Sequence, residues 1–155
     1  MLNIQIPGRE ALVLHHLILD YNGTIAEDGN IIESIRPRLE ELSRDLSIYV
    51  ITADTHGTAA GKCEGLPLQV LTFPTTEVGE IKAREAKKLE GGVITIGNGF
   101  NDIQMSDAAD LSICVIGREG CCGPLISHCD VVVTSIEDAL DLLLIPGRVR
   151  ATLRT

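Results

Sequence analysis

The chain has 155 residues, of which 45% are hydrophobic and 23% are charged, and its formal net charge at pH 7 is −9. This is the composition of an ordinary soluble globular protein, and the length fits one domain over residues 1–155. The acidic balance argues against nucleic acid or an anionic membrane surface as the main partner. No apolar run approaches the roughly 20 residues that span a bilayer, and Met1–Gln5 does not begin a secretory signal, so we expect a cytoplasmic location.

The first half of the chain predicts a β-hairpin followed by alternating helices and strands. Apolar residues at 2–6 and 11–19 flank a Pro7-Gly8 turn, and this pattern predicts the hairpin. Apolar residues at helical spacing predict an amphipathic helix over Glu33–Leu46. The elements expected next are a strand at Ser47–Thr52, a small-residue helix at Gly57–Cys63 and a strand at Leu68–Phe73 that Pro74 ends.

The second half continues the alternation of helices and strands. We expect a charged helix at Glu77–Leu89, a strand at Gly92–Ile96, a polar turn at 97–102, strands at Leu111–Ile116 and Asp130–Val133, a helix at Ser135–Leu144 and an arginine-bearing tail at Pro146–Thr155. Ser135 and Asp138 fit a capping box at the start of that last helix. The alternation predicts an α/β fold, a three-layer sandwich with a central parallel sheet between helices.

Polar side chains follow three of the predicted strands. Asp20 comes directly after the buried strand, Thr52 closes the next strand, and the 97–102 turn follows a later one. The carboxyl ends of parallel strands lie at one edge of a sheet, where ligands bind, so we expect these residues to converge. A hairpin turn in which Asp20 and Asn22 bond their own backbone explains the first of these stretches equally well.

Four motifs, in this order, resemble those of the haloacid dehalogenase (HAD) superfamily of phosphohydrolases, above all its soluble P-type-ATPase-like phosphatases. Asp20-Tyr21-Asn22-Gly23-Thr24 resembles D-K-T-G-T, Thr52-Ala53-Asp54 resembles T-G-D, Lys82 with Ala86 and Leu89 resembles K-x-x-x-V-x-x-L, and residues 97–102 resemble G-D-G-x-N-D. The resemblance implies a HAD-like, Rossmann-like fold and phosphatase activity.

The resemblance also implies a role for each matched residue. Asp20 would attack phosphorus and form an aspartyl-phosphate, with a phosphorylated molecule as substrate. The implied phosphate ligands are Gly23, Thr52, Ala53 and Lys82, and the implied Mg²⁺ ligands are Asp20, the Asn22 carbonyl, Asn98 and Asp102. Without the motif order, Lys82 would be interpreted as a solvated helix lysine like Lys87 and Lys88.

Two positions depart from the family pattern. Asn22 stands where phosphatases of the superfamily carry a second Asp, and an amide cannot shuttle a proton. Asn98 replaces a metal-ligating Asp, which removes one negative charge and shifts more of the metal binding to Asp102 and Asp107. Both changes predict slow or selective turnover. They also motivate an alternative, a catalytically impaired module that senses phosphate or metal.

The spacing of the motifs leaves no room for a large cap domain. Only 31 residues separate Asp20 from Thr52, and 29 separate Thr52 from Lys82. An uncapped site is open to a large substrate such as a phosphoprotein, or to closure by a second subunit of a homo-oligomer.

Five cysteines remain outside the motifs. They are Cys63, Cys114, Cys121, Cys122 and Cys129. Reduced thiols are the default in a chain without a secretory signal, and Cys114 falls inside an apolar strand as a core residue would. The alternative is a thiol-based metal or redox sensor built from Cys121, Cys122 and Cys129, although the chain has no C-x-x-C pair.

Overall fold

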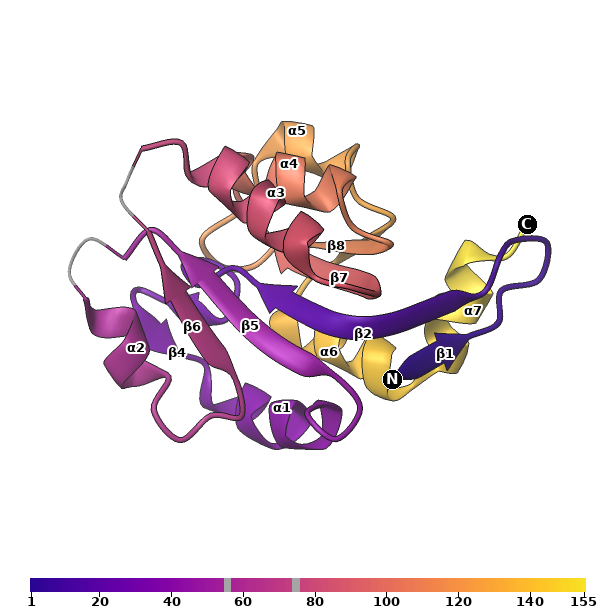
Figure 1. The fold of residues 1–155 in the computed structure, drawn as a ribbon, viewed down its shortest axis with the longest axis horizontal. Helices are drawn as coiled ribbons and strands as arrows, with labels where there is room; N and C mark the ends of the chain where they lie inside the picture. The colour runs from indigo at the N-terminus through magenta and orange to yellow at the C-terminus, as the bar shows by residue number, and fades with distance from the viewer. Residues whose placement is uncertain (55–56, 74–75) are drawn as a thin grey trace.

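A mainly parallel sheet forms the middle layer of the protein, in a computed structural model that describes residues 1–54, 57–73 and 76–155. Within these residues six parallel strands run in the order β6–β5–β2–β7–β8–β9, and β1 adds to β2 as an antiparallel hairpin partner (Figure 1). The strands are β1 Leu2–Ile4, β2 Leu12–Leu19, β5 Ser47–Thr52, β6 Gln69–Thr72, β7 Gly92–Gly97, β8 Leu111–Val115 and β9 Val131–Val133. The predicted parallel sheet and N-terminal hairpin are confirmed, while Pro74 lies outside the described residues.

Helices cover both faces of this sheet (Figure 1). One face carries α1 (Arg36–Leu42) and α6 (Ile136–Leu144), and α7 (Pro146–Leu153) packs beside β1. The other face carries α3 (Val78–Lys88), α4 (Ile103–Asp107) and the short α5 (Gly123–Ile126). The predicted three-layer sandwich is confirmed.

Strand β2 is central because its apolar side chains pack in the cores on both faces of the sheet. Leu17 and Leu19 belong to the large core under α1 and α6, whereas Ile18 packs with Ala86 and Met105 under α3 and α4. None of the three β2 residues is exposed to solvent. A continuous apolar run of this kind is what a parallel strand covered on both faces requires.

Two elements differ from the sequence predictions. The helix predicted to reach Leu46 consists of a 3₁₀ turn, η1 (Glu33–Ile35), and α1, which ends at Leu42; Leu46 still packs in the core. The predicted C-terminal tail is α7, which begins at Pro146, a residue well suited to a first helical turn, and buries Val149.

A small hairpin between β2 and α1 was not predicted at all. Strands β3 (Ala26–Glu27) and β4 (Asn30–Ile31) pair antiparallel across Asp28 and Gly29. Both turn residues have positive φ angles, 50° and 78°, as a type I′ hairpin turn requires. This hairpin and the helices η1 and α1 are all that the structure places between Asp20 and β5, which agrees with the expected lack of a large cap.

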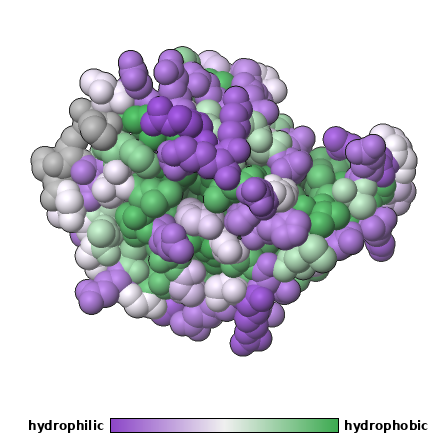
Figure 2. Space-filling view, viewed as in Figure 1, coloured by the Kyte–Doolittle hydropathy of each residue, from purple (hydrophilic) through white to green (hydrophobic). Residues whose placement is uncertain are grey.

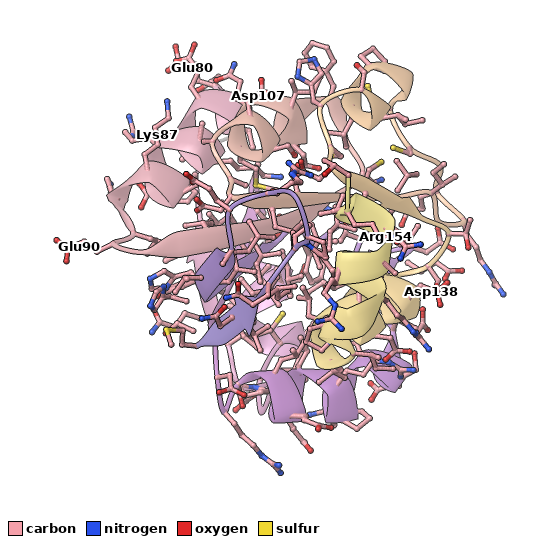
Figure 3. The ribbon with its side chains drawn as sticks, turned by 90° about the vertical axis from the view of Figure 1, so that its right-hand side faces the viewer. Glu80, Lys87, Glu90, Asp107, Asp138 and Arg154 are labelled. Carbon is pink, nitrogen blue, oxygen red and sulfur yellow. The ribbon has the colours of Figure 1, made fainter. Side chains whose placement is uncertain are left out.

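The face that carries α3 is divided between polar and apolar surface. Figure 2 shows hydrophilic side chains over α3 and apolar ones over the neighbouring β5–β6 end of the sheet. Figure 3 shows Glu80 and Lys87 of α3 pointing away from the sheet into solvent. Among the described residues, no helix is long and apolar enough to cross a membrane.

Candidate active site

Three neighbouring strands of the sheet bring the motif residues to one edge. Leu19, the last residue of β2, pairs with Val50 of β5 and with Ile96 of β7, so the three strands end at nearly the same level. Asp20 follows immediately, and its amide donates to the Ile96 carbonyl at 3.0 Å. Thr52 closes β5 and Asn98 follows β7. The predicted convergence of these strand ends is therefore found in the fold.

A buried lysine joins two carboxylates at this edge. The Nζ atom of Lys82 donates to Oδ1 of Asp20 and to Oδ1 of Asp102, both at 2.6 Å. It also donates to Oδ1 of Asn101 at 3.0 Å. The Lys82 side chain is 1% exposed, in contrast to Lys87 and Lys88 of the same helix, which are exposed. Interpreting Lys82 as a solvated lysine is therefore wrong.

Asp102 uses both of its oxygens within the protein. Oδ1 accepts from Lys82, and Oδ2 accepts from the backbone amides of Asn98 at 3.0 Å and Gly99 at 2.9 Å. Gly97 leaves the space for this carboxylate, because a Cβ atom at residue 97 would collide with it. Asp102 therefore fixes both the 97–102 turn and the lysine. These contacts favour a positioning role over the direct metal coordination expected from the sequence.

The charges of this cluster do not balance. Burial raises the pKa of Asp20, the negative charge of Asp102 raises it further, and Lys82 opposes both, so the pKa lies at about 6. For Lys82, burial alone would lower the pKa, but the two carboxylates outweigh burial and raise it. Lys82 therefore stays charged at neutral pH, and two carboxylates share one ammonium group. The excess negative charge favours binding of a cation beside Asp20.

The loop after Asp20 is held by its own backbone and by Asn98. The Tyr21 carbonyl accepts amide hydrogen bonds from Thr24, Ile25 and Ala26. Gly23 has a φ angle of +76°, and a Cβ atom there would collide with the Asn98 side chain, so the turn requires glycine. The Asn98 amide group accepts from Thr24 Oγ1 and donates to the Gly120 carbonyl, both at 3.2 Å.

The remaining predicted residues lie around this cluster. Thr52 is 3% exposed at the end of β5, and Ala53 follows it partly exposed. Asn22, two residues after Asp20, is exposed. Asp107 is paired with His128 on the surface at 2.7 Å, which gives it a partner other than the cluster. The phosphate-binding roles of Gly23, Thr52 and Ala53 stay predictions.

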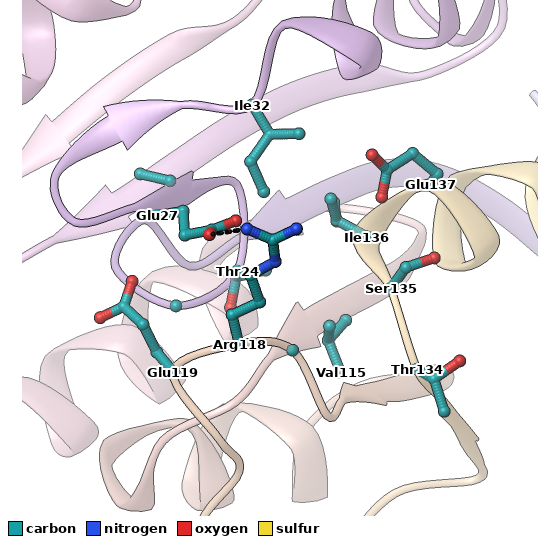
Figure 4. Close-up of a pocket in the computed structure, with 13 residues that line it drawn as sticks. Thr24, Glu27, Ile32, Val115, Arg118, Glu119, Thr134, Ser135, Ile136 and Glu137 are labelled. Atoms are coloured by element: carbon teal, nitrogen blue, oxygen red, sulfur yellow. Dashed lines mark hydrogen bonds and ion pairs between the residues drawn. The ribbon is translucent and has the colours of Figure 1, made fainter.

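A pocket of about 390 Å³ borders the Asp20 loop (Figure 4). Gly23 and Thr24 form one wall, and the segment with Arg118 and Glu119 forms another. Arg118 reaches across to Glu27 of β3, with 3.2 Å between Nη1 and Oε1. The sequence motifs include Gly23 and Thr24 but not Glu27, Arg118 or Glu119. Gly117 and Gly120 on either side of Arg118 mark the loop, but they do not reveal that it meets the β3–β4 hairpin.

The donor set suits a hard cation that keeps most of its water. No group of three His, Cys, Asp or Glu residues placed to hold a metal occurs within residues 1–54, 57–73 and 76–155. Mg²⁺ needs no such group, since it often takes one or two carboxylates and completes its shell with water and substrate. The Asp20 carboxylate, with Asn22 and Asn98 nearby, offers oxygen donors beside excess negative charge. The residues therefore fit Mg²⁺.

Replacing Lys82 by Met should destabilise the fold by about 3–5 kcal/mol, because it leaves Asp20 and Asp102 buried without their cation. Lys87→Met, at an exposed site of the same helix, should change stability by less than about 0.5 kcal/mol. Urea denaturation at pH 7.5 measures both free energies of unfolding. Equal effects of the two substitutions would show that the Lys82 cluster is solvated in solution.

Sequence comparison finds a close relative of part of the chain. Over 85 residues the chain is 44% identical to the uncharacterized protein MJ0073 from Methanocaldococcus jannaschii; the match spans 53% of this chain and 91% of that protein. No family model matches the chain.

Solved structures with low sequence identity share the fold. A Streptomyces avermitilis protein described as a HAD family hydrolase superposes with a TM-score of 0.67 at 17% identity, covering 86% of this chain and 87% of that one. The 3-deoxy-D-manno-octulosonate 8-phosphate phosphatase of Moraxella catarrhalis, solved with magnesium and phosphate ions, gives 0.71 at 15% identity, covering 89% and 90%. The chain therefore belongs to the same family as MJ0073, and its fold is that of the HAD hydrolases, as the sequence motifs predict.

Proposed function

We propose that the protein is a Mg²⁺-dependent phosphatase that forms an aspartyl-phosphate on Asp20. The observation that carries the proposal is the buried Asp20–Lys82–Asp102 cluster at the carboxyl edge of the sheet. It sets a carboxylate, an ammonium group and spare negative charge at the place where α/β folds bind ligands. The fold shared with phosphatases supports the same activity.

Each residue of the cluster contributes to phosphoryl transfer. The Asp20 carboxylate attacks phosphorus, and the bond from phosphorus to the ester oxygen breaks. Lys82 balances the charge of the transferred group, while Asp102 and Asn101 keep its ammonium aimed at Asp20. Thr52 and the amides near Gly23 and Ala53 bind the phosphoryl oxygens. Asp20, the Asn22 carbonyl and Asn98 would hold Mg²⁺, which would supply further positive charge to those oxygens.

Neither half of the reaction has a dedicated proton carrier. Asn22, two residues after Asp20, is exposed, and its amide neither gives nor takes a proton at neutral pH. The leaving oxygen must take its proton from solvent, and the water that attacks the aspartyl-phosphate must give up its proton to solvent. Hydrolysis of the intermediate is therefore the slow step.

The substrate is a phosphate monoester that reaches an uncapped site. The pocket is lined by Gly23 and Thr24 of the loop that follows Asp20, and Phe100, in the 97–102 turn, has 73% of its surface exposed. This open rim accommodates a large phosphorylated substrate or a second subunit.

A simple assay tests the proposal. Hydrolysis of p-nitrophenyl phosphate should require added Mg²⁺ and should stop when EDTA is added in excess. Restoring Mg²⁺ should restore the rate. A rate that is the same with Mg²⁺ and with EDTA would refute the metal dependence, and no hydrolysis under any divalent cation would refute the phosphatase.

Asn98→Asp should tighten Mg²⁺ binding on the order of tenfold, because a carboxylate replaces a neutral amide ligand. Isothermal titration calorimetry measures the affinity. Asn101→Asp is the matched control, since it adds the same charge within reach of Lys82 but outside the proposed ligand set. If Asn101→Asp tightens binding as much, the gain comes from charge alone and Asn98 is no ligand.

One observation favours the alternative, a module that binds phosphate or metal without turnover. Both ends of the Asn98 amide are engaged, by Thr24 and by Gly120, as in a purely structural residue. Such a module would bind Mg²⁺ or inorganic phosphate in calorimetry and yet release no p-nitrophenol.

A further inference from the structure

A cysteine of strand β8 and a cysteine of the segment that follows it are in contact. Cys114 is the fourth residue of β8 and is fully buried, whereas Cys121 lies in the 116–122 segment between β8 and α5 and is partly exposed. Their Sγ atoms are 2.7 Å apart. A disulfide bond is about 2.05 Å long, so the two sulfur atoms need only a small further approach to bond.

The other cysteines have different surroundings. The Sγ atom of Cys129 lies 3.7 Å from Ser106 Oγ, and Cys63 is buried in the core on the opposite face of the sheet. The backbone amide of Cys122 donates a hydrogen bond to the Asn98 carbonyl at 2.8 Å. Within the described residues, Cys114 and Cys121 are the cysteines whose sulfur atoms are in contact.

The 116–122 segment connects two parts of the candidate site. It holds Asn98 twice, through the Gly120 carbonyl and the Cys122 amide. It also holds the β3–β4 hairpin, because Arg118 pairs with Glu27, and Glu119 accepts from the Asp28 amide at 3.2 Å. A covalent link at Cys121 would therefore fix the segment that supports Asn98 and the pocket wall.

We propose that Cys114 and Cys121 form a reversible disulfide that fastens the 116–122 segment to β8. The oxidant is a small-molecule disulfide. The partly exposed Cys121 attacks it as the thiolate, forms a mixed disulfide and releases one thiol. Cys114 then loses its proton and attacks the Cys121 sulfur, which breaks the mixed disulfide and releases the second thiol. Two protein thiols are oxidised, and one small disulfide is reduced to two thiols.

The structure indicates what this bond does. The sulfur atoms meet while the hydrogen bonds of the segment to Asn98 are in place, so the disulfide preserves the site geometry. The bond closes a loop of eight residues, 114–121, and removes conformational freedom from the unfolded chain. For a chain of this length the melting temperature should rise by roughly 5–10 °C. Burial raises the pKa of the Cys114 thiol, which makes the second exchange step the slower one.

The experiment counts thiols in the full-length protein. The reduced protein is incubated with oxidised glutathione and quenched in acid, and its remaining thiols are blocked with N-ethylmaleimide in denaturant at neutral pH. Intact mass and peptide mapping then count the blocked thiols and locate the cross-link. We expect three blocked cysteines and a cross-linked peptide pair that joins Cys114 to Cys121. Dithiothreitol should return all five thiols. Five blocked thiols after oxidation, a lasting glutathione adduct on Cys121, or a bond to another cysteine would overturn the proposal.

Cys121→Ser and Cys122→Ser form a matched pair of adjacent, partly exposed sites. Cys121→Ser should abolish both the cross-link and the rise in melting temperature, whereas Cys122→Ser should keep both. A cross-link that survives Cys121→Ser, or one that Cys122→Ser removes, contradicts the assignment. Neither readout depends on phosphatase activity, so the disulfide and the proposed function can fail independently.

Discussion

Asp20→Asn should lower the rate of p-nitrophenyl phosphate hydrolysis by at least about a thousandfold without destabilising the metal-free protein. Asn cannot form the acyl-phosphate, so activity is lost. Stability should not fall, because burial and Asp102 raise the pKa of Asp20 to about 6. The unfolded carboxyl has a pKa near 4, so the folded state binds its proton more tightly, and ionisation of Asp20 works against folding as the pH rises from about 4 to 6.

The stability of Asp20→Asn therefore has a specific pH dependence. At pH 7.5 in EDTA its melting temperature should equal or exceed that of the wild type, and the difference should shrink towards pH 4. Asp107→Asn, at an exposed carboxylate of α4, is the control and should keep near wild-type activity. A comparable loss of activity in Asp107→Asn would mean that Asp20 has been assigned the wrong role.

Asn22→Asp should raise turnover by about a hundredfold to ten-thousandfold, the usual contribution of a general acid/base. The new carboxylate would protonate the leaving oxygen and activate the water that hydrolyses the aspartyl-phosphate. Steady-state turnover and the amplitude of the initial burst measure the effect, and the burst should shrink as hydrolysis accelerates. Asn22→Ala keeps the backbone carbonyl and should stay near the wild-type rate. A large loss in Asn22→Ala would assign the amide a direct role that we do not give it.

The sheet was predictable because its strands carry strong local patterns. The apolar run that ends at Leu19 and the runs that end at Thr52 and Ile96 each stop at a polar turn, and parallel topology brings such turns together. The β3–β4 hairpin was missed because its strands have two residues each, too few for a pattern, although Asp28-Gly29 is a recognisable hairpin turn. Helix α7 was missed because its apolar stripe is narrow, with Val149 as its buried residue.

Side-chain direction limited the prediction of the site. The motif order placed Lys82 near Asp20, and the structure has them in contact. The sequence could not show that one Asp102 oxygen accepts a hydrogen bond from Lys82 and the other accepts from amides of its own turn. These contacts depend on how the 97–102 turn folds back. It also could not pair Cys121 with Cys114, since that contact follows from the path of the loop after β8.

The central claim, that Asp20 carries the phosphoryl group, is tested most directly by trapping the intermediate. The wild-type protein is mixed with Mg²⁺ and p-nitrophenyl phosphate, quenched in acid within the burst, digested and mapped by mass spectrometry under acidic conditions. Our account predicts one phosphorylated peptide, with the phosphate on Asp20, and its disappearance in Asp20→Asn. Turnover without any trapped phosphoprotein, or phosphate mapped to another residue, would contradict it.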